Sequence, residues 1–109
     1  MTDLELKALM DSTGLYYDPE HPDYIEEQKL AELPLAFMEW DLEEVSFFAD
    51  GECYFTRRRL LVRVFWDSQT KSAVRIVTAA LKAARLGFTT EKEFLPELGF
   101  WQTTFTTEV

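Results

Sequence analysis

The chain has 109 residues, of which 47% are hydrophobic and 15% aromatic, and its formal net charge is −9. This length predicts a single domain over residues 1–109, and the apolar content is enough for one core, which argues against a disordered chain. The negative charge makes nucleic-acid binding by the whole surface unfavourable, because phosphate would be repelled.

The cysteine content and the hydropathy indicate the compartment. The chain has one cysteine, Cys53, so no intrachain disulfide can form and the framework of a small secreted domain is missing. The first residues, MTDLELKALMDS, lack the basic and apolar regions of a secretory signal, and no apolar run reaches the roughly 18 residues of a membrane span. We therefore expect a cytoplasmic protein without a membrane partner.

A first helix is expected over residues 2–13. Thr2 and Glu5 have the spacing of a capping box, in which each side chain accepts a hydrogen bond from the other residue's backbone N–H. Gly14 suits the left-handed conformation that commonly follows the last helical turn. The pattern therefore predicts a short helix with defined ends.

A proline-containing loop is expected next, at residues 15–24, LYYDPEHPDY. Each proline disfavours helix in the residue before it. Asp23 and Glu26 have the spacing of a second capping box, which predicts a short helix over residues 24–33.

Residues 34–44 fit both a helix and a strand, and we expect a strand after about residue 36 because Phe37 and Trp40 favour it. The Asp50-Gly51 pair between two β-rich runs is typical of a two-residue hairpin loop. That loop predicts three cross-strand pairs: Ala49 with Glu52, Phe47 with Tyr54, and Glu44 with Arg57.

A third strand is expected at residues 59–67, followed by a helix at residues 70–86 that Ser68 or Thr70 caps and Gly87 ends. The strand and the helix each have an apolar face, so we expect the two faces to pack together. The predicted centre of the core consists of Val62, Val64, Trp66, Val77 and Leu81. A basic stripe lies opposite the apolar face of the helix, on an outward surface: Lys71, Arg75, Lys82 and Arg85.

The C-terminal residues predict one more helix and one more strand. Thr90 and Glu93 have capping-box spacing, which predicts a short helix, and FWQTTFTTEV alternates as a final strand. The expected order is α-α-β-β-β-α-α-β. This order predicts an α+β fold, with a small antiparallel sheet of about four strands and helices packed on one face.

Charge is distributed unevenly along the chain. Residues 1–56 hold 15 acids and two lysines, residues 57–86 hold eight bases and one acid, and residues 87–109 hold four acids and one lysine. The central segment begins with three consecutive arginines, Arg57 to Arg59. Two interpretations stay open: the bases pair with acids inside the molecule, or they form an open basic surface for a partner.

The sequence contains no catalytic or metal-binding motif. One cysteine and one histidine cannot supply a four-ligand zinc site, and residues 18–23, DPEHPD, match no calcium-loop spacing. Cys53 and His21 lack a local motif for a nucleophile–base dyad, and there is no phosphate-binding glycine loop or hydrolase motif. We therefore predict a protein that is not an enzyme and needs no metal or cofactor.

These features favour a non-catalytic protein-binding module of the inhibitor or immunity type, with a basic protein such as a nuclease as its partner. Tyrosines supply rigid contact area and carboxylates attract a basic surface. The candidate binding residues are Tyr16, Tyr17, Asp18, Glu20, Asp23 and Tyr24 in the loop, with Arg75 and Lys82 on the basic helix. Two alternatives are a homodimeric chaperone or assembly factor and a nucleic-acid-associated regulator that uses residues 57–86, although the net charge disfavours nucleic acid.

Overall fold

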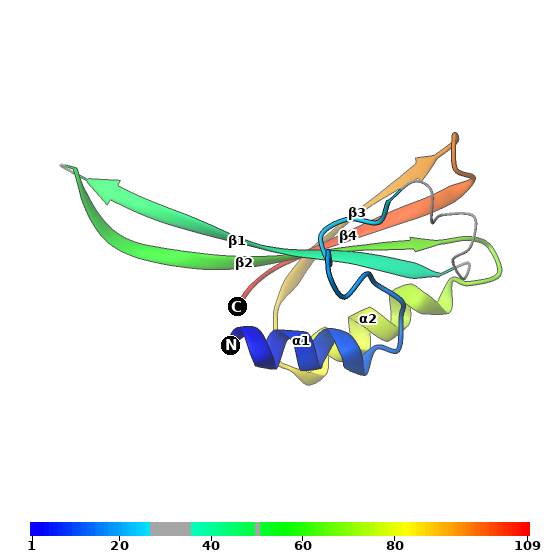
Figure 1. Ribbon diagram of the computed structural model, residues 1–109, viewed down its shortest axis with the longest axis horizontal. Coiled ribbons are helices and arrows are strands. Elements are labelled where there is room, and N and C mark those ends of the chain that lie inside the picture. The colour runs from blue at the N-terminus through cyan, green and yellow to red at the C-terminus, as the bar shows by residue number, and fades with distance from the viewer. Residues whose placement is uncertain (27–35, 50) are drawn as a thin grey trace.

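The computed structural model describes residues 1–26, 36–49 and 51–109 and shows an α+β fold (Figure 1). Four strands form one antiparallel sheet in the order β1-β2-β4-β3. The predicted fold class, an antiparallel sheet of four strands with helices, is confirmed. The elements in chain order are α1 (Asp3–Ser12), β1 (Phe37–Ala49), β2 (Glu52–Trp66), α2 (Ser72–Ala83), β3 (Phe88–Leu95) and β4 (Phe100–Glu108).

Helix α1 has the ends that the sequence predicts. Thr2 Oγ1 accepts a hydrogen bond from the Glu5 N–H at 3.2 Å, and the Glu5 carboxylate accepts one from the Thr2 N–H at 3.0 Å. Gly14 follows the helix with a φ of +73°, a conformation that glycine adopts without steric cost.

The loop after α1 lies along the outer edge of β1. The backbone N–H of Met38 donates to the Tyr16 carbonyl at 2.8 Å, and that of Trp40 donates to the Pro22 carbonyl at 2.7 Å. These bonds satisfy backbone groups that an outer strand would otherwise leave unpaired.

The helix predicted over residues 24–33 is not present where the structure describes this segment. Residues 24–26 are not helical, and the rest of the predicted helix lies outside the described residues. The Ile25 N–H donates to the Glu39 carboxylate at 2.8 Å. This bond holds the end of the loop against β1, where the sequence predicted the first turn of a helix.

Strands β1 and β2 form one long hairpin, so the expected break before residue 59 is wrong. The pair Ala49–Glu52 is confirmed, but a register shift occurs between Phe47 and Phe48. An extra residue in one strand, as in a β-bulge, moves every later pair by one position. The corrected pairs are therefore Phe47 with Phe55, Val45 with Arg57, and Glu44 with Arg58.

The closed end of this hairpin extends beyond the rest of the sheet (Figure 1). Strand β4 pairs with β2 from Arg59 to Trp66, and the Val109 N–H donates to the Arg58 carbonyl at 3.1 Å. Within the described residues, positions 52–57 therefore pair with β1 alone. The molecule is consequently elongated, with dimensions of 50 × 28 × 25 Å.

Helix α2 is shorter than the expected range 70–86. Its N-cap residue, Lys71, makes no side-chain capping bond. Asp67 and Thr70 instead close the preceding turn, because Asp67 Oδ1 accepts from the Thr70 N–H at 3.0 Å and Thr70 Oγ1 accepts from the Asp67 N–H at 2.8 Å. At the other end Arg85, with a φ of 59°, occupies the left-handed position expected for Gly87.

Residues 88–95 form a strand, so the short helix predicted from Thr90 and Glu93 is wrong. Strand β3 pairs with β4 along its whole length, from Phe88 opposite Thr107 to Leu95 opposite Phe100. Eight residues of pairing outweigh a capping signal that depends on two side chains, because local propensity is easily overridden by tertiary structure.

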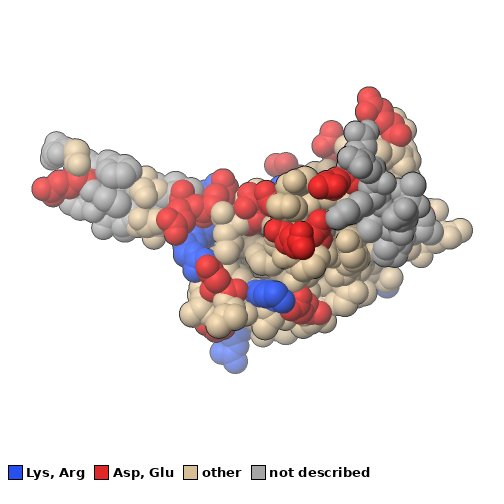
Figure 2. All heavy atoms as spheres, in the orientation of Figure 1, with Lys and Arg blue, Asp and Glu red and all other residues tan. Residues whose placement is uncertain are grey.

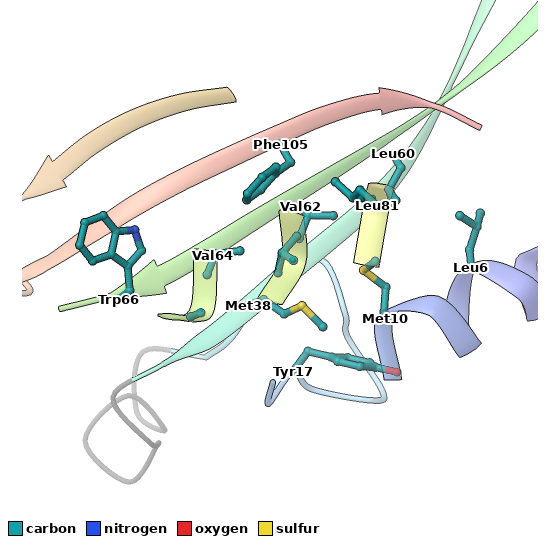
Figure 3. Packing of buried hydrophobic residues seen from close by; sticks show 12 residues of the cluster. Leu6, Met10, Tyr17, Met38, Leu60, Val62, Val64, Trp66, Leu81 and Phe105 are labelled. Atoms are coloured by element: carbon teal, nitrogen blue, oxygen red, sulfur yellow. The ribbon is translucent and has the colours of Figure 1, made fainter. Parts of the chain in front are cut away.

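The core lies between one face of the sheet and residues of both helices (Figure 3). All five predicted core residues are buried, with Val62, Val64, Val77 and Leu81 fully inaccessible and Trp66 6% exposed. Leu6 and Met10 of α1 belong to the same cluster. The predicted packing of the apolar face of β2 against α2 is therefore confirmed.

Candidate functional site

The arginines of β2 are paired with carboxylates inside the molecule. Each has an acidic side chain within 4 Å: Arg57 with Glu108, Arg58 with Asp3, Arg59 with Glu43 and Arg63 with Glu39. Two of these pairs follow directly from strand register, because Glu43 faces Arg59 and Glu39 faces Arg63 across the hairpin. For β2, the interpretation that the bases pair internally is confirmed.

The bases of α2 have a different environment. Among the described residues, no carboxylate forms an ion pair with the stripe residues Lys71, Arg75, Lys82 and Arg85. All four residues are exposed. The basic segment of the sequence is therefore divided into a strand whose arginines have acidic partners and a helix whose bases have none among the described residues.

Three bases of the stripe line a groove between α2 and β3, which we call the cationic groove. Its volume is about 640 Å³. Its lining includes the aromatic residues Trp66, Phe88 and Phe105, of which Phe88 is the most exposed, and threonines 78, 90 and 103. Among the described residues, no acidic residue lines it. Its four basic residues are Lys71, Arg75, Lys82 and Lys92.

The groove exists because α2 covers only part of the sheet. Val77 and Leu81 of α2 pack into the core with the apolar face of β2, while β3 lies two strands away from β2. Lys71, Arg75 and Lys82 follow helical spacing along the side of α2. All three are exposed, as the predicted outward stripe requires, and they also line a groove with the sheet.

Lys92 is held in the groove by two indole rings. Its Nζ lies 4.4 Å from the ring centroid of Trp101 and 5.1 Å from that of Trp66, within the range of a cation–π interaction. The two rings stack with centroids 5.8 Å apart, and Trp66 Nε1 donates to Thr103 Oγ1 at 2.8 Å. These contacts place a positive charge over the sheet, and no carboxylate in the described ranges forms an ion pair with it.

Sequence reasoning missed Lys92 because its segment was assigned to a helix. The signal that could have found it is the alternation of Phe88, Thr90, Lys92 and Phe94, which continues the alternating pattern of β4. In the observed register Lys92 faces Thr103, a residue that is 5% exposed.

The tyrosine-rich loop contains both buried and exposed candidates. Tyr17 and Asp18 are 9% and 5% exposed. The Tyr17 hydroxyl donates to the Asp11 carboxylate, and Asp18 Oδ1 accepts from the Glu20 N–H at 3.0 Å. Burial and the bond to Asp11 raise the pKa of the Tyr17 phenol. These two residues organise the loop from within.

The remaining loop candidates are on the surface. Tyr16, Glu20, Asp23 and Tyr24 are exposed, and the Tyr24 ring stacks on His21 with centroids 5.2 Å apart. Figure 2 shows a face on which acidic residues far outnumber basic ones. The loop lies along β1, and the groove lies beside β3. These are the two outer strands of the sheet, so the loop candidates and the groove residues Arg75 and Lys82 belong to separate surfaces.

The described residues show no metal-binding cluster. No group of three or more His, Cys, Asp or Glu side chains in this part of the chain is placed to hold an ion. The side chain of Cys53 lies outside the described part of the structure, so the dyad with His21 falls there too. No helix in the described ranges is both long and apolar enough to cross a membrane.

Comparison with known proteins identifies no relative. Family models, curated proteins and solved structures were all compared with the chain, and none of them matches it.

Proposed function

We propose that the chain is a non-catalytic protein-binding module and that the cationic groove is its main binding surface. The observation that carries the proposal is the contrast between the two sets of bases. The four arginines of β2 have acidic partners, whereas four bases line the groove beside aromatic residues, and no acid from the described part of the chain lines it. An acidic region of a partner protein would complement these charges.

The composition of the groove suits protein recognition. Binding energy at protein interfaces concentrates in aromatic and arginine side chains that become desolvated, surrounded by a polar rim. Phe88 and Arg75 supply such groups in one concave site, and the exposed Thr90 supplies a hydroxyl. This combination supports a partner that offers both carboxylates and apolar side chains.

A second candidate surface is the exposed part of the loop, formed by Tyr16, Glu20, Asp23 and Tyr24. Its tyrosines and carboxylates support contact with a basic partner, as an inhibitor or immunity protein would make. The nucleic-acid alternative has less support, because four of the eight bases in residues 57–86 are paired internally and four are left: Lys71, Arg75, Lys82 and Arg85.

Affinity capture from host lysate tests the proposal with two charge-matched variants. The groove variant carries Arg75→Glu and Lys82→Glu, and the control variant carries Arg57→Glu and Arg85→Glu, two exposed residues that do not line the groove. Each reversal changes the charge by −2, so both variants have a net charge of −9 − 4 = −13. Any difference between them reflects the site and not the total charge.

The wild-type chain and the control variant should retain a stoichiometric protein partner, and the groove variant should lose it. Equal retention by all three proteins would show that the binding surface lies outside the groove, and the exposed part of the loop would be the next candidate. The absence of any stoichiometric partner for the wild-type chain would overturn the protein-binding function itself.

A further inference from the structure

The free edge of the sheet lies directly beside the cationic groove. Strand β3 is an outer strand, and its six central residues are exposed. The other outer strand, β1, is covered at its start by the carbonyls of Tyr16 and Pro22. Within the described residues, no backbone hydrogen bond covers the outer edge of β3 between Phe88 and Phe94 in this way.

An outer strand presents unpaired N–H and C=O groups on which another strand can be added. Phe88, Thr90 and Lys92 belong both to this strand and to the lining of the groove. A chain that pairs with β3 would therefore run alongside the groove, and every second side chain would point toward α2.

The spacing of the bases fits an extended chain better than a compact anion. Lys71 and Lys82 are 11 residues apart on α2, which corresponds to about 16 Å along a helix. An extended peptide covers that distance with about five residues at roughly 3.3 Å each. Charges spread over such a length can meet several carboxylates on alternate residues of one strand.

We propose that β3 accepts an extended acidic segment of a partner protein as an additional strand, with alternate side chains of that segment entering the cationic groove. The inference rests on the proposed function, because it specifies how the groove binds its partner. Carboxylates of the segment would meet Lys71, Arg75 and Lys82, and its apolar side chains would contact the half-buried ring of Phe88. Nucleic acid could use the bases but has no peptide groups with which to pair the edge of β3.

The charges of β3 favour carboxylates on one face of an added strand only. Lys92 lines the groove, and strand alternation puts Glu91 and Glu93 on the opposite face, where uncharged residues of the segment would lie. Lys92 is a charged residue on the inner face of an outer strand, a device that discourages indiscriminate edge pairing. A second copy of this chain would bring another Lys92 and another basic stripe to the same place. Repulsion between these like charges disfavours the pairing of two copies. Glutamates of a partner strand that face Lys92 would instead attract it.

The probe for this mode is a blocked eight-residue peptide in which glutamate alternates with valine and threonine. The full-length chain, labelled with ¹⁵N, is titrated with this peptide up to millimolar concentration, and amide chemical shifts are recorded. We expect the largest shifts in the amides of β3 between Thr89 and Phe94 and along α2. Replacing the glutamates of the peptide with glutamines should weaken binding about tenfold or more, because each carboxylate loses a charged partner.

Two N-methylated peptides separate strand addition from simple charge attraction. One carries N-methyl groups on the odd residues and the other on the even residues, since only every second residue of an added strand directs its N–H toward β3. One peptide should lose binding about tenfold or more and the other should bind like the parent, because one set of methyl groups blocks the ladder and the other faces solvent.

Three results would overturn the inference. Equal binding of both methylated peptides would show that the groove attracts charge without strand pairing, and the proposed function would stand. No peptide-induced shift at β3 would exclude this edge, while capture of a partner would still decide the proposed function independently. Displacement of the peptide by an eight-nucleotide oligothymidylate that binds more tightly at physiological salt would assign the groove to single-stranded nucleic acid.

Discussion

Replacing Trp66 with alanine removes a side chain that joins the core to the cationic groove. Trp66 is 6% exposed, stacks on Trp101 with ring centroids 5.8 Å apart, and donates its indole N–H to Thr103 Oγ1 at 2.8 Å. The Lys92 ammonium group lies 5.1 Å from its ring centroid. Each contact is lost in the variant, and the Thr103 hydroxyl keeps no indole donor.

The expected loss in the free energy of unfolding is about 3–5 kcal/mol, the usual cost of truncating a buried tryptophan. Within that total, the hydrogen bond accounts for about 1 kcal/mol and the ring stacking for about 0.5–1.5 kcal/mol. The remainder comes from lost burial and the cavity. A domain of this size has about 5–15 kcal/mol in all, so the variant should be close to unfolding under mild denaturant.

Urea unfolding followed by far-ultraviolet circular dichroism measures the effect, because this signal does not depend on the deleted indole. The conservative variant Trp66→Phe retains most of the ring area and should lose only about 1–2 kcal/mol, chiefly through the unpaired Thr103 hydroxyl. A value for Trp66→Ala within about 0.5 kcal/mol of wild type would be typical of a surface substitution. That result would refute the assignment of this face of β2 to the core.

The local features of the fold give three further predictions. Thr2→Ala removes the capping box of α1 and should lower the unfolding free energy by about 0.5–2 kcal/mol; no change in the urea midpoint would contradict it. Gly99 has a φ of +71° with open space at its Cβ position, so Gly99→Ala should cost about 1–2 kcal/mol through backbone strain alone, and an unchanged or higher melting temperature would disprove it. Burial and the bond to Asp11 raise the folded-state pKa of Tyr17, so its contribution to stability is complete below about pH 10 and is lost as the pH rises further. Urea unfolding between roughly pH 8 and pH 11 should therefore show a steeper loss of stability in wild type than in Tyr17→Phe, and equal slopes would argue against this role.

Local signals in the sequence predicted those parts of the fold that depend on neighbouring residues. Thr2 and Glu5 bound α1 as expected, Asp50-Gly51 marked the hairpin, and alternation identified the buried face of β2. The same type of signal failed at Thr90 and Glu93, since pairing with β4 decides the conformation of residues 88–95. The register shift between Phe47 and Phe48 has no local signature, and it moved the expected partner of Glu44 from Arg57 to Arg58.

The candidate site was partly predictable for a similar reason. Arg75 and Lys82 follow from helical spacing alone, but their place beside an open strand depends on the sheet order, which brings β3 to the edge. Lys92 and Trp66 meet across two strand pairings that no single segment encodes. The sequence also could not show which basic residues have acidic partners. Such pairs depend on contacts between distant segments, as between Arg58 and Asp3, which are 55 positions apart.

The association rate of the captured partner tests the central claim, that the open bases of the cationic groove form the binding surface. The rate is measured for wild type, for the groove variant (Arg75→Glu, Lys82→Glu) and for the control variant (Arg57→Glu, Arg85→Glu), at about 10 mM and about 150 mM salt, where the Debye length falls from about 30 Å to about 8 Å. At low salt the groove variant should associate about tenfold or more slowly than wild type, the control should stay within about threefold of it, and the gap should narrow at high salt. Equal slowing of both variants would contradict the account, because total charge and not the cationic groove would then control binding.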